Sequence, residues 1–231
     1  PNFFEDITDI PKADQTLEDI LKERFTWRDL IVKDVLLNDR ITLKAKIEDM
    51  EDEVLANAGV DVFEEVFKLI FTKLYDETQS KDDKVIIDRT VKKKLKADET
   101  GDFEKLKMVL KEIDDSDFRI LEFRNTGQTD AQLKEKIQKL FGEAKKEWPG
   151  VFPNESRIDL SPSHLSICVS SLQDVKLFNS NLQVIDEAFE YLVSKSSKGE
   201  KGQYFTPRHV IDMCVKMLNP KRGEYMIDTA A

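Results

Sequence analysis

The stretch DVFEEVFKLIFTKLYDE, residues 61–77, decides the fold class of this chain. Its apolar residues recur at steps of four, three and four, which is the spacing of one face of an α-helix. This stripe consists of Phe63, Phe67, Ile70 and Leu74. Four neighbours widen it, namely Val62, Val66, Leu69 and Phe71. So broad an apolar face is typical of a helix that is buried against several neighbours.

The start of this helix also has a local signal. Asp61 followed by Glu64 resembles a capping box, so we expect a helix from Val62 to Glu77. Its phenylalanine-rich face has two possible roles, the core of a helical bundle or the wall of a ligand pocket. A core is the more frequent role of such a stripe, and we expect a core here.

Working outward, helical spacing and capping residues predict further helices with short turns between them. The expected ranges are 16–37 with a break near Thr26 and Trp27, 41–57 ending before Gly59, 103–113, 130–147 capped by Asp130, 161–172 opened by Ser161 and Pro162, and 182–193. A short strand is expected at 118–123, where FRILEF precedes a turn. The chain up to about residue 195 is therefore expected to be an α-helical domain.

Residues 78–100 hold the densest charge in the chain. Lys92-Lys93-Lys94-Leu95-Lys96 is the only strongly basic cluster, and acidic neighbours dilute it. Such a run is most often a solvated face or a mobile loop, which is our expectation. Contact with a nucleic-acid backbone is the alternative.

Composition limits the function classes. The 231 residues include 36 basic and 46 acidic side chains, for a net charge of −10. Because a DNA duplex would repel most of such a chain, it is not mainly a DNA-binding surface. The apolar fraction of 40% is high enough for a packed core.

The cysteines and histidines exclude some further classes. Cys168 and Cys214, with His164 and His209, form no cluster with the spacing of a zinc site. Two isolated cysteines fit a reducing cytoplasm, and we expect Cys214 to be a buried core thiol. No apolar run approaches the roughly 20 residues that span a bilayer, and no secretory signal is visible.

The composition changes at Ser194, where a small, polar stretch punctuated by glycine predicts a loop over 194–202. A helix is expected over 210–218, ended by Asn219 and Pro220, and Gly223 then turns the chain. Tyr225 to Ile227 are expected to form a strand that ends at Asp228. The local order is therefore loop, helix, turn, strand and acid.

Thr206 and Pro207 give this stretch a chemical character. Proline holds the preceding threonine out of helical conformation, so Thr206 is suited to cap a helix that Pro207 opens. The free N–H groups of that first turn, with Arg208, suit an anion such as a carboxylate. Tyr204 and Phe205 precede them and are able to lie against a flat ring. An ordinary helix start without a ligand is the other interpretation.

The stretch GQYFTPRHVIDMCVKMLNP, residues 202–220, followed by a strand and Asp228, resembles the amino-methylating DNA methyltransferase (M) subunits of type I restriction–modification systems. The helical region that contains residues 61–77 is similar to the N-terminal helical domain of these subunits. The resemblance implies a mainly α chain, in which a multi-helix N-terminal domain precedes the first helix and strand of a truncated α/β, Rossmann-like methyltransferase domain. The implied domains are 1–40, a linker or extension, 41–195, helical, and 196–231, the start of the methylase domain.

The resemblance also implies a cofactor and a site. In the family, the FTP segment and the acid after the first strand help to bind S-adenosylmethionine, which donates a methyl group to the adenine amino group of DNA. The residues of this chain that match are Gln203, Tyr204, Phe205, Thr206, Pro207, Arg208 and Asp228. The implied partners are DNA, a specificity subunit and a restriction subunit, without a membrane, in the cytoplasm.

Two departures from the family pattern limit the expected activity. The glycines that follow the acid in the family have no counterpart here, and threonine follows Asp228 where proline is usual. The catalytic (N/D)-P-P-(F/Y) motif is absent from all 231 residues. We therefore expect these residues to be a catalytically inactive part of the enzyme that serves in DNA gripping and subunit contacts. The alternatives are a helical protein–protein interaction module without a cofactor, and part of a fused restriction nuclease–methylase.

Overall fold

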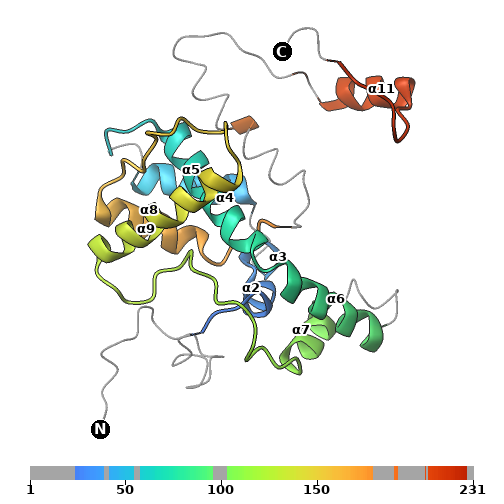
Figure 1. Ribbon diagram of the computed structural model, residues 1–231, viewed down its shortest axis with the longest axis horizontal. Coiled ribbons are helices and arrows are strands. Elements are labelled where there is room, and N and C mark those ends of the chain that lie inside the picture. The colour runs from blue at the N-terminus through green and yellow to red at the C-terminus, as the bar shows by residue number, and fades with distance from the viewer. Residues whose placement is uncertain are drawn as a thin grey trace. The chain divides into compact units, whose positions relative to one another are not determined.

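The computed structural model describes residues 24–38, 42–54, 58–95, 103–178, 190–191, 206 and 208–227 (Figure 1). The chain divides into two compact units, residues 1–189 and 190–231. All regular elements of the described ranges are helices, which confirms the expected mainly α class. The Rossmann-like start that we expected at the end of the chain is not seen in these ranges.

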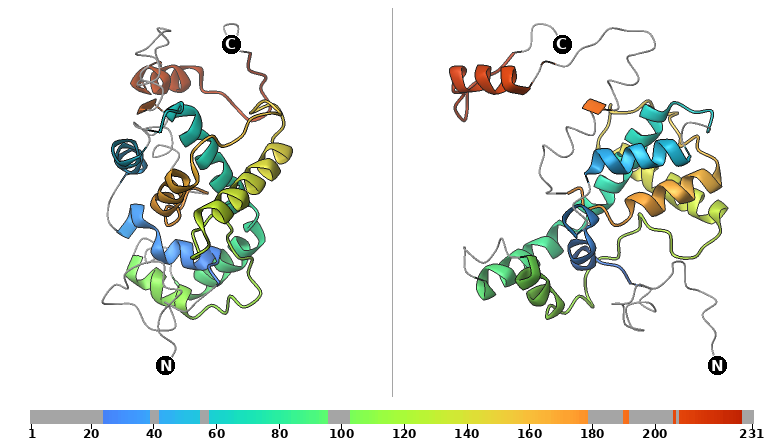
Figure 2. Two further views of the ribbon diagram at one scale, coloured as in Figure 1. Left: turned by 90° about the vertical axis from the view of Figure 1, so that its left-hand side faces the viewer. Right: turned by 180° about the vertical axis from the view of Figure 1, so that it is seen from behind.

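The helices of the first unit form two packed groups (Figure 2). In one group α5 packs on α8, and α9 packs on both α8 and α4; in the other, α2, α6 and α7 pack on one another. The helices of the first group are α4 (Leu43–Glu53), α5 (Val62–Thr78), α8 (Asp130–Glu147) and α9 (Pro162–Leu172). Those of the second are α2 (Trp27–Lys33), α6 (Lys81–Lys94) and α7 (Phe103–Lys111), and the short helix α3 (Val35–Asn38) follows α2.

Short-range capping explains where several helices begin. The Asp61 carboxylate accepts the N–H of Glu64 at 2.9 Å at the start of α5, as its sequence predicts. Ser161 caps α9 with Pro162 as its first residue, also as predicted. The cap of α8 is Thr129 and not the expected Asp130, because the side chains of Thr129 and Gln132 form a capping box one residue earlier.

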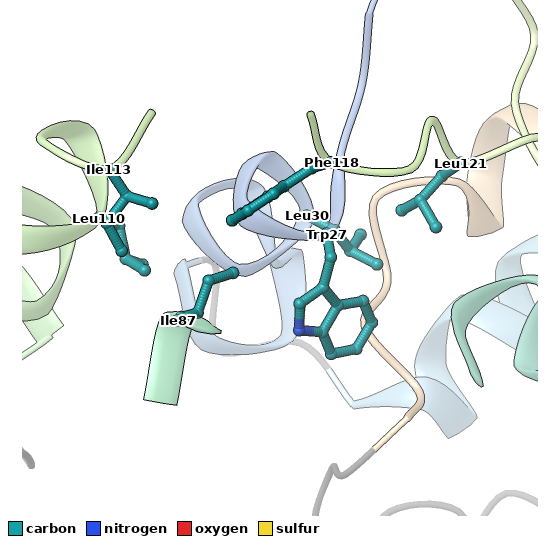
Figure 3. Packing of buried hydrophobic residues seen from close by; sticks show 7 residues of the cluster. All are labelled: Trp27, Leu30, Ile87, Leu110, Ile113, Phe118 and Leu121. Atoms are coloured by element: carbon teal, nitrogen blue, oxygen red, sulfur yellow. The ribbon is translucent and has the colours of Figure 1, made fainter. Parts of the chain in front are cut away.

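The second group is built around a hydrophobic cluster (Figure 3). Its buried members are Trp27, Leu30, Ile87, Leu110, Ile113, Phe118 and Leu121. The helix α2 begins at Trp27, where a break was predicted. The Trp27 ring lies 5.7 Å from that of Phe178, so this cluster also contacts the segment that follows α9.

The phenylalanine stripe of α5 is half-buried and packs on other rings. The Phe67 and Phe71 rings each lie 5.1 Å from the ring of Phe152, and Phe71 lies 4.7 Å from Trp148. The more deeply buried part of α5 includes Val66, Leu69 and Ile70 of the predicted stripe, and it also carries charges that the apolar periodicity does not reveal. These buried charged residues are Glu65, Lys68, Lys73, Asp76 and Glu77.

Three carboxylates of this part of α5 share one arrangement, in which one oxygen accepts two consecutive backbone N–H groups and the other faces a cation. The Asp76 carboxylate receives the N–H groups of Glu122 and Phe123, both at 2.8 Å, and pairs with Arg119 at 2.7 Å. A buried carboxylate is stable only with such partners. Asp76 therefore fixes the irregular segment around residue 122 on α5.

Glu65 and Glu77 repeat the arrangement on two other segments. Glu65 accepts the N–H groups of Asp159 and Leu160 at 3.0 and 3.2 Å and pairs with Lys68 at 2.7 Å. Glu77 accepts the N–H groups of Leu177 and Phe178 at 2.9 and 2.7 Å and pairs with Lys73 at 2.9 Å.

Lys73 makes a further hydrogen bond to the segment that Glu77 holds, because its ammonium donates to the Gln173 carbonyl at 3.2 Å. Complete burial raises the pKa of Glu77, although Lys73 and the two N–H donors act to lower it.

A further buried acid, Asp34, binds the last described segment of this unit, residues 173–178. The Asp34 carboxylate, between α2 and α3, accepts the N–H groups of Leu36 and Lys176, both at 3.2 Å. Burial raises the pKa of Asp34 in spite of these bonds. Asp34 and Glu77 therefore hold neighbouring residues of the segment 173–178 from two different elements.

The prediction of a strand at 118–123 is wrong. Ile120 forms one isolated antiparallel bridge with Thr26, and the N–H groups of Glu122 and Phe123 donate to Asp76 instead of a neighbouring strand. The helix expected at 41–57 is shorter, because α4 ends at Glu53. Of the two expectations for the basic cluster, a solvated face fits the structure and a loop does not, because Lys92, Lys93 and Lys94 are exposed on α6; residue 96 lies outside the described ranges. None of the helices in the described ranges combines the length and apolar character needed to cross a lipid bilayer.

Replacing Lys73 with Met is expected to lower the free energy of unfolding by about 3–5 kcal/mol, because the Glu77 carboxylate is left buried without a cation. Urea unfolding followed by circular dichroism measures this change. The matched control is Glu143→Gln, which breaks an exposed pair with Lys146 and should cost less than about 1 kcal/mol. The double variant Lys73→Met, Glu77→Gln should recover most of the loss. Equal effects of Lys73→Met and the control would contradict the buried pair.

Replacing Asp34 with Asn is expected to flatten the pH dependence of stability. The raised pKa means that the folded state favours the protonated acid. The stability that the protonated acid provides is lost as pH rises from the ordinary pKa of 3.8 through the raised value. Asn keeps the accepting oxygen and cannot ionise. In urea unfolding at pH 3, 5 and 7, Asp34→Asn should gain stability relative to the unchanged chain as pH rises. A relative loss at pH 7 would show that the ionised acid is favoured in the fold.

Candidate functional site

The predicted cofactor segment lies at the start of α11 (Arg208–Leu218) in the second unit. Thr206 is exposed and not helical, and α11 begins two residues after it, earlier than the helix expected from residue 210. Residue 207 between them lies outside the described residues, so the cap at Thr206 stays a prediction. The other predicted site residues, Gln203, Tyr204, Phe205, Pro207 and Asp228, lie outside the described residues, and the structure places only the backbone of Arg208.

The end of α11 follows the predicted signals. Asn219 adopts a left-handed conformation with φ of +46°, and its N–H donates to the Val215 carbonyl at 2.8 Å. Pro220 then prevents continuation of the helix. Gly223, with φ of +93°, turns the chain, and the Glu224 carboxylate accepts the Lys221 N–H at 2.8 Å. Local chemistry alone therefore determines this helix end and turn.

Two expectations for this region are wrong. Cys214 is exposed and not a core thiol, because no described residue of the second unit covers the apolar face of α11. Tyr225, Met226 and Ile227 form no strand and are 84–104% exposed. A strand needs a partner for its backbone groups, and none lies beside these residues in the described part of the unit.

The polar side of α11 borders a shallow groove. Its lining residues are His209, Asp212, Met213, Lys216 and Met217, which occur at helical spacing on one side of the helix. The spacing of His209, Asp212 and Lys216 is the sequence signal for this side of the helix. His209, Asp212 and Lys216 give the groove both acidic and basic side chains.

The chemical character of this unit comes from the N-terminal end of α11. The first N–H groups of α11 have no acceptor within the helix, and the positive end of the helix dipole favours an anion there. Arg208 adds a cation at the same end. Within the described residues, no group of three His, Cys, Asp or Glu side chains is arranged to hold a metal ion.

The comparisons with known proteins concern the same end of the chain. Residues 180–231 match the family model described as N-6 DNA Methylase. This match contains α11 and every predicted site residue, and it supports an adenine DNA methyltransferase family. No curated protein and no solved structure matches the chain significantly.

The two cysteines are expected to differ in reactivity. Burial raises the pKa of Cys168 to about 12, whereas Cys214 is exposed on α11. Brief treatment of the native chain with iodoacetamide at pH 8 should therefore alkylate Cys214 alone, as mapped by peptide mass spectrometry. Cys168 should react only after urea is added, and Cys214→Ser should remove the native labelling. Protection of Cys214 would show that the apolar face of α11 is covered.

Proposed function

We propose that this chain is part of an adenine-specific DNA methyltransferase of a restriction–modification system, similar to a type I M subunit. The observation that carries the proposal is the match of residues 180–231 to the N-6 DNA methylase model, a range that contains Thr206 and the N-terminus of α11 two residues after it. The helical first unit is consistent with the helical domain that precedes the methylase domain in such subunits.

S-adenosylmethionine is the cofactor that this function requires, and it supplies the methyl group. The residues present fit its methionine end, because a carboxylate suits the free N–H groups and positive dipole of a helix start. In the proposal, the first turn of α11 and Arg208 hold the carboxylate, Tyr204 and Phe205 lie against the adenine, and Asp228 bonds to a polar group of the cofactor.

The proposal assigns binding, and not catalysis, to these residues. The (N/D)-P-P-(F/Y) motif that holds the flipped adenine in the family is absent from the 231 residues. We therefore expect the 231 residues alone to transfer no methyl group. Incubation with tritiated S-adenosylmethionine and unmethylated DNA should give no label above a buffer blank.

The decisive experiment uses the complete gene. Its expression in a bacterial host without adenine methylation should produce N6-methyladenine, detected by mass spectrometry of digested DNA. Arg208→Ala should weaken cofactor binding by the purified enzyme about tenfold or more, since a charged partner is lost.

The matched control is Arg222→Ala, which removes an exposed arginine of the same unit. This variant should bind the cofactor as the unchanged enzyme does. A gene product that neither binds the cofactor nor methylates DNA would leave Thr206 as an ordinary helix start.

A further inference from the structure

The outer face of α6 is an exposed surface with an unusual composition. Its seven residues are Lys81, Asp82, Val85, Ile86, Arg89, Lys92 and Lys93, and all are exposed. Asp82, Val85, Arg89 and Lys92 follow one another at steps of three, four and three, which is the spacing of a seam between two packed helices. The opposite face of α6 is the packed one, where Ile87 enters the hydrophobic cluster (Figure 3).

The cations of the outer face are unpaired, whereas those beside it are not. Lys84 pairs with Asp88 at 2.6 Å, Lys94 with Glu112 at 2.5 Å and Lys107 with Glu104 at 3.4 Å. In the described ranges, no ion pair is made by the four cations of the outer face. They are Lys81, Arg89, Lys92 and Lys93. With Asp82 as its single acid, the face carries a net charge of +3 in a chain of −10.

Helix stability accounts for part of this pattern only. Asp82 in the first turn and the lysines of the last turn interact favourably with the helix dipole. Lys81 lies in the first turn, where the dipole disfavours a cation. Val85 and Ile86 are 44% and 48% exposed and gain nothing from the dipole. Two adjacent aliphatic side chains among unpaired cations remain to be explained.

We propose that the outer face of α6 binds an acidic amphipathic helix of a protein partner. Such a helix supplies both missing components, an apolar stripe for Val85 and Ile86 and carboxylates for the flanking cations. A DNA backbone supplies phosphates but little apolar surface, so the two aliphatic residues favour a protein partner over DNA. This surface is separate from the α11 site, and the inference does not depend on the proposed methyltransferase function.

The test uses the full chain and two synthetic helical peptides of roughly 20 residues, long enough to form a helix. Both peptides carry leucines at positions i, i+3, i+4 and i+7; one has glutamate at the flanking positions and the other has lysine. Fluorescence anisotropy should show binding of the acidic peptide and at least tenfold weaker binding of the basic one.

Variants then assign the binding to the face. The triple variant Arg89→Glu, Lys92→Glu, Lys93→Glu should bind the acidic peptide at least tenfold more weakly and should gain binding of the basic peptide. The double variant Val85→Ser, Ile86→Ser should also weaken binding. The control Lys139→Glu, at an exposed unpaired lysine of α8, should leave binding unchanged. Circular dichroism confirms that each variant is folded.

Three results would overturn the proposal. One is the absence of binding by the acidic peptide, and another is binding that survives the triple variant. The third is duplex DNA binding that the triple variant abolishes and the Val85, Ile86 double variant does not, because it would assign the face to nucleic acid.

Discussion

The first unit depends on the requirement that every buried carboxylate of α5 have backbone donors and a nearby cation. Glu65, Asp76 and Glu77 each place one oxygen on two successive backbone N–H groups and the other near a cation. An unpaired buried charge is far more costly than a paired one. The central helix therefore has one arrangement in which its charges are tolerated, and its neighbours must supply the donors.

The donors come from segments without regular structure. The backbone around residues 122, 159 and 177 has no ladder or helix of its own, and the carboxylates of α5 take the place of one. The last of these segments is held most extensively, by Asp34, Lys73 and Glu77. It is also the segment that leads toward the part of the chain matching the methylase model, which begins at residue 180.

The two units differ in how far their apolar residues are buried and their charges paired. In the first unit many hydrophobic residues of α5, α8 and α9 are buried, and the buried carboxylates of α5 pair with cations. In the second unit the described apolar residues of α11 and of residues 225–227 are largely exposed. The left-handed Asn219 nevertheless gives α11 a defined C-terminal end. This end of the helix is thus a local property, whereas burial of its apolar face requires other residues.

The sequence alone determined most of the helices and several of their ends, because capping and turn signals act within four residues. Asp61, Ser161, Asn219 and Gly223 show this directly. The same local chemistry indicated the segment around Thr206 that the methylase match contains. Tertiary structure alone decided which face of α5 is buried, the loss of the strand at 118–123 and the roles of Asp34, Asp76 and Glu77. The backbone N–H groups by which they hold other segments lie 46 to 142 residues away along the chain, and no local periodicity encodes a hydrogen bond over such a separation.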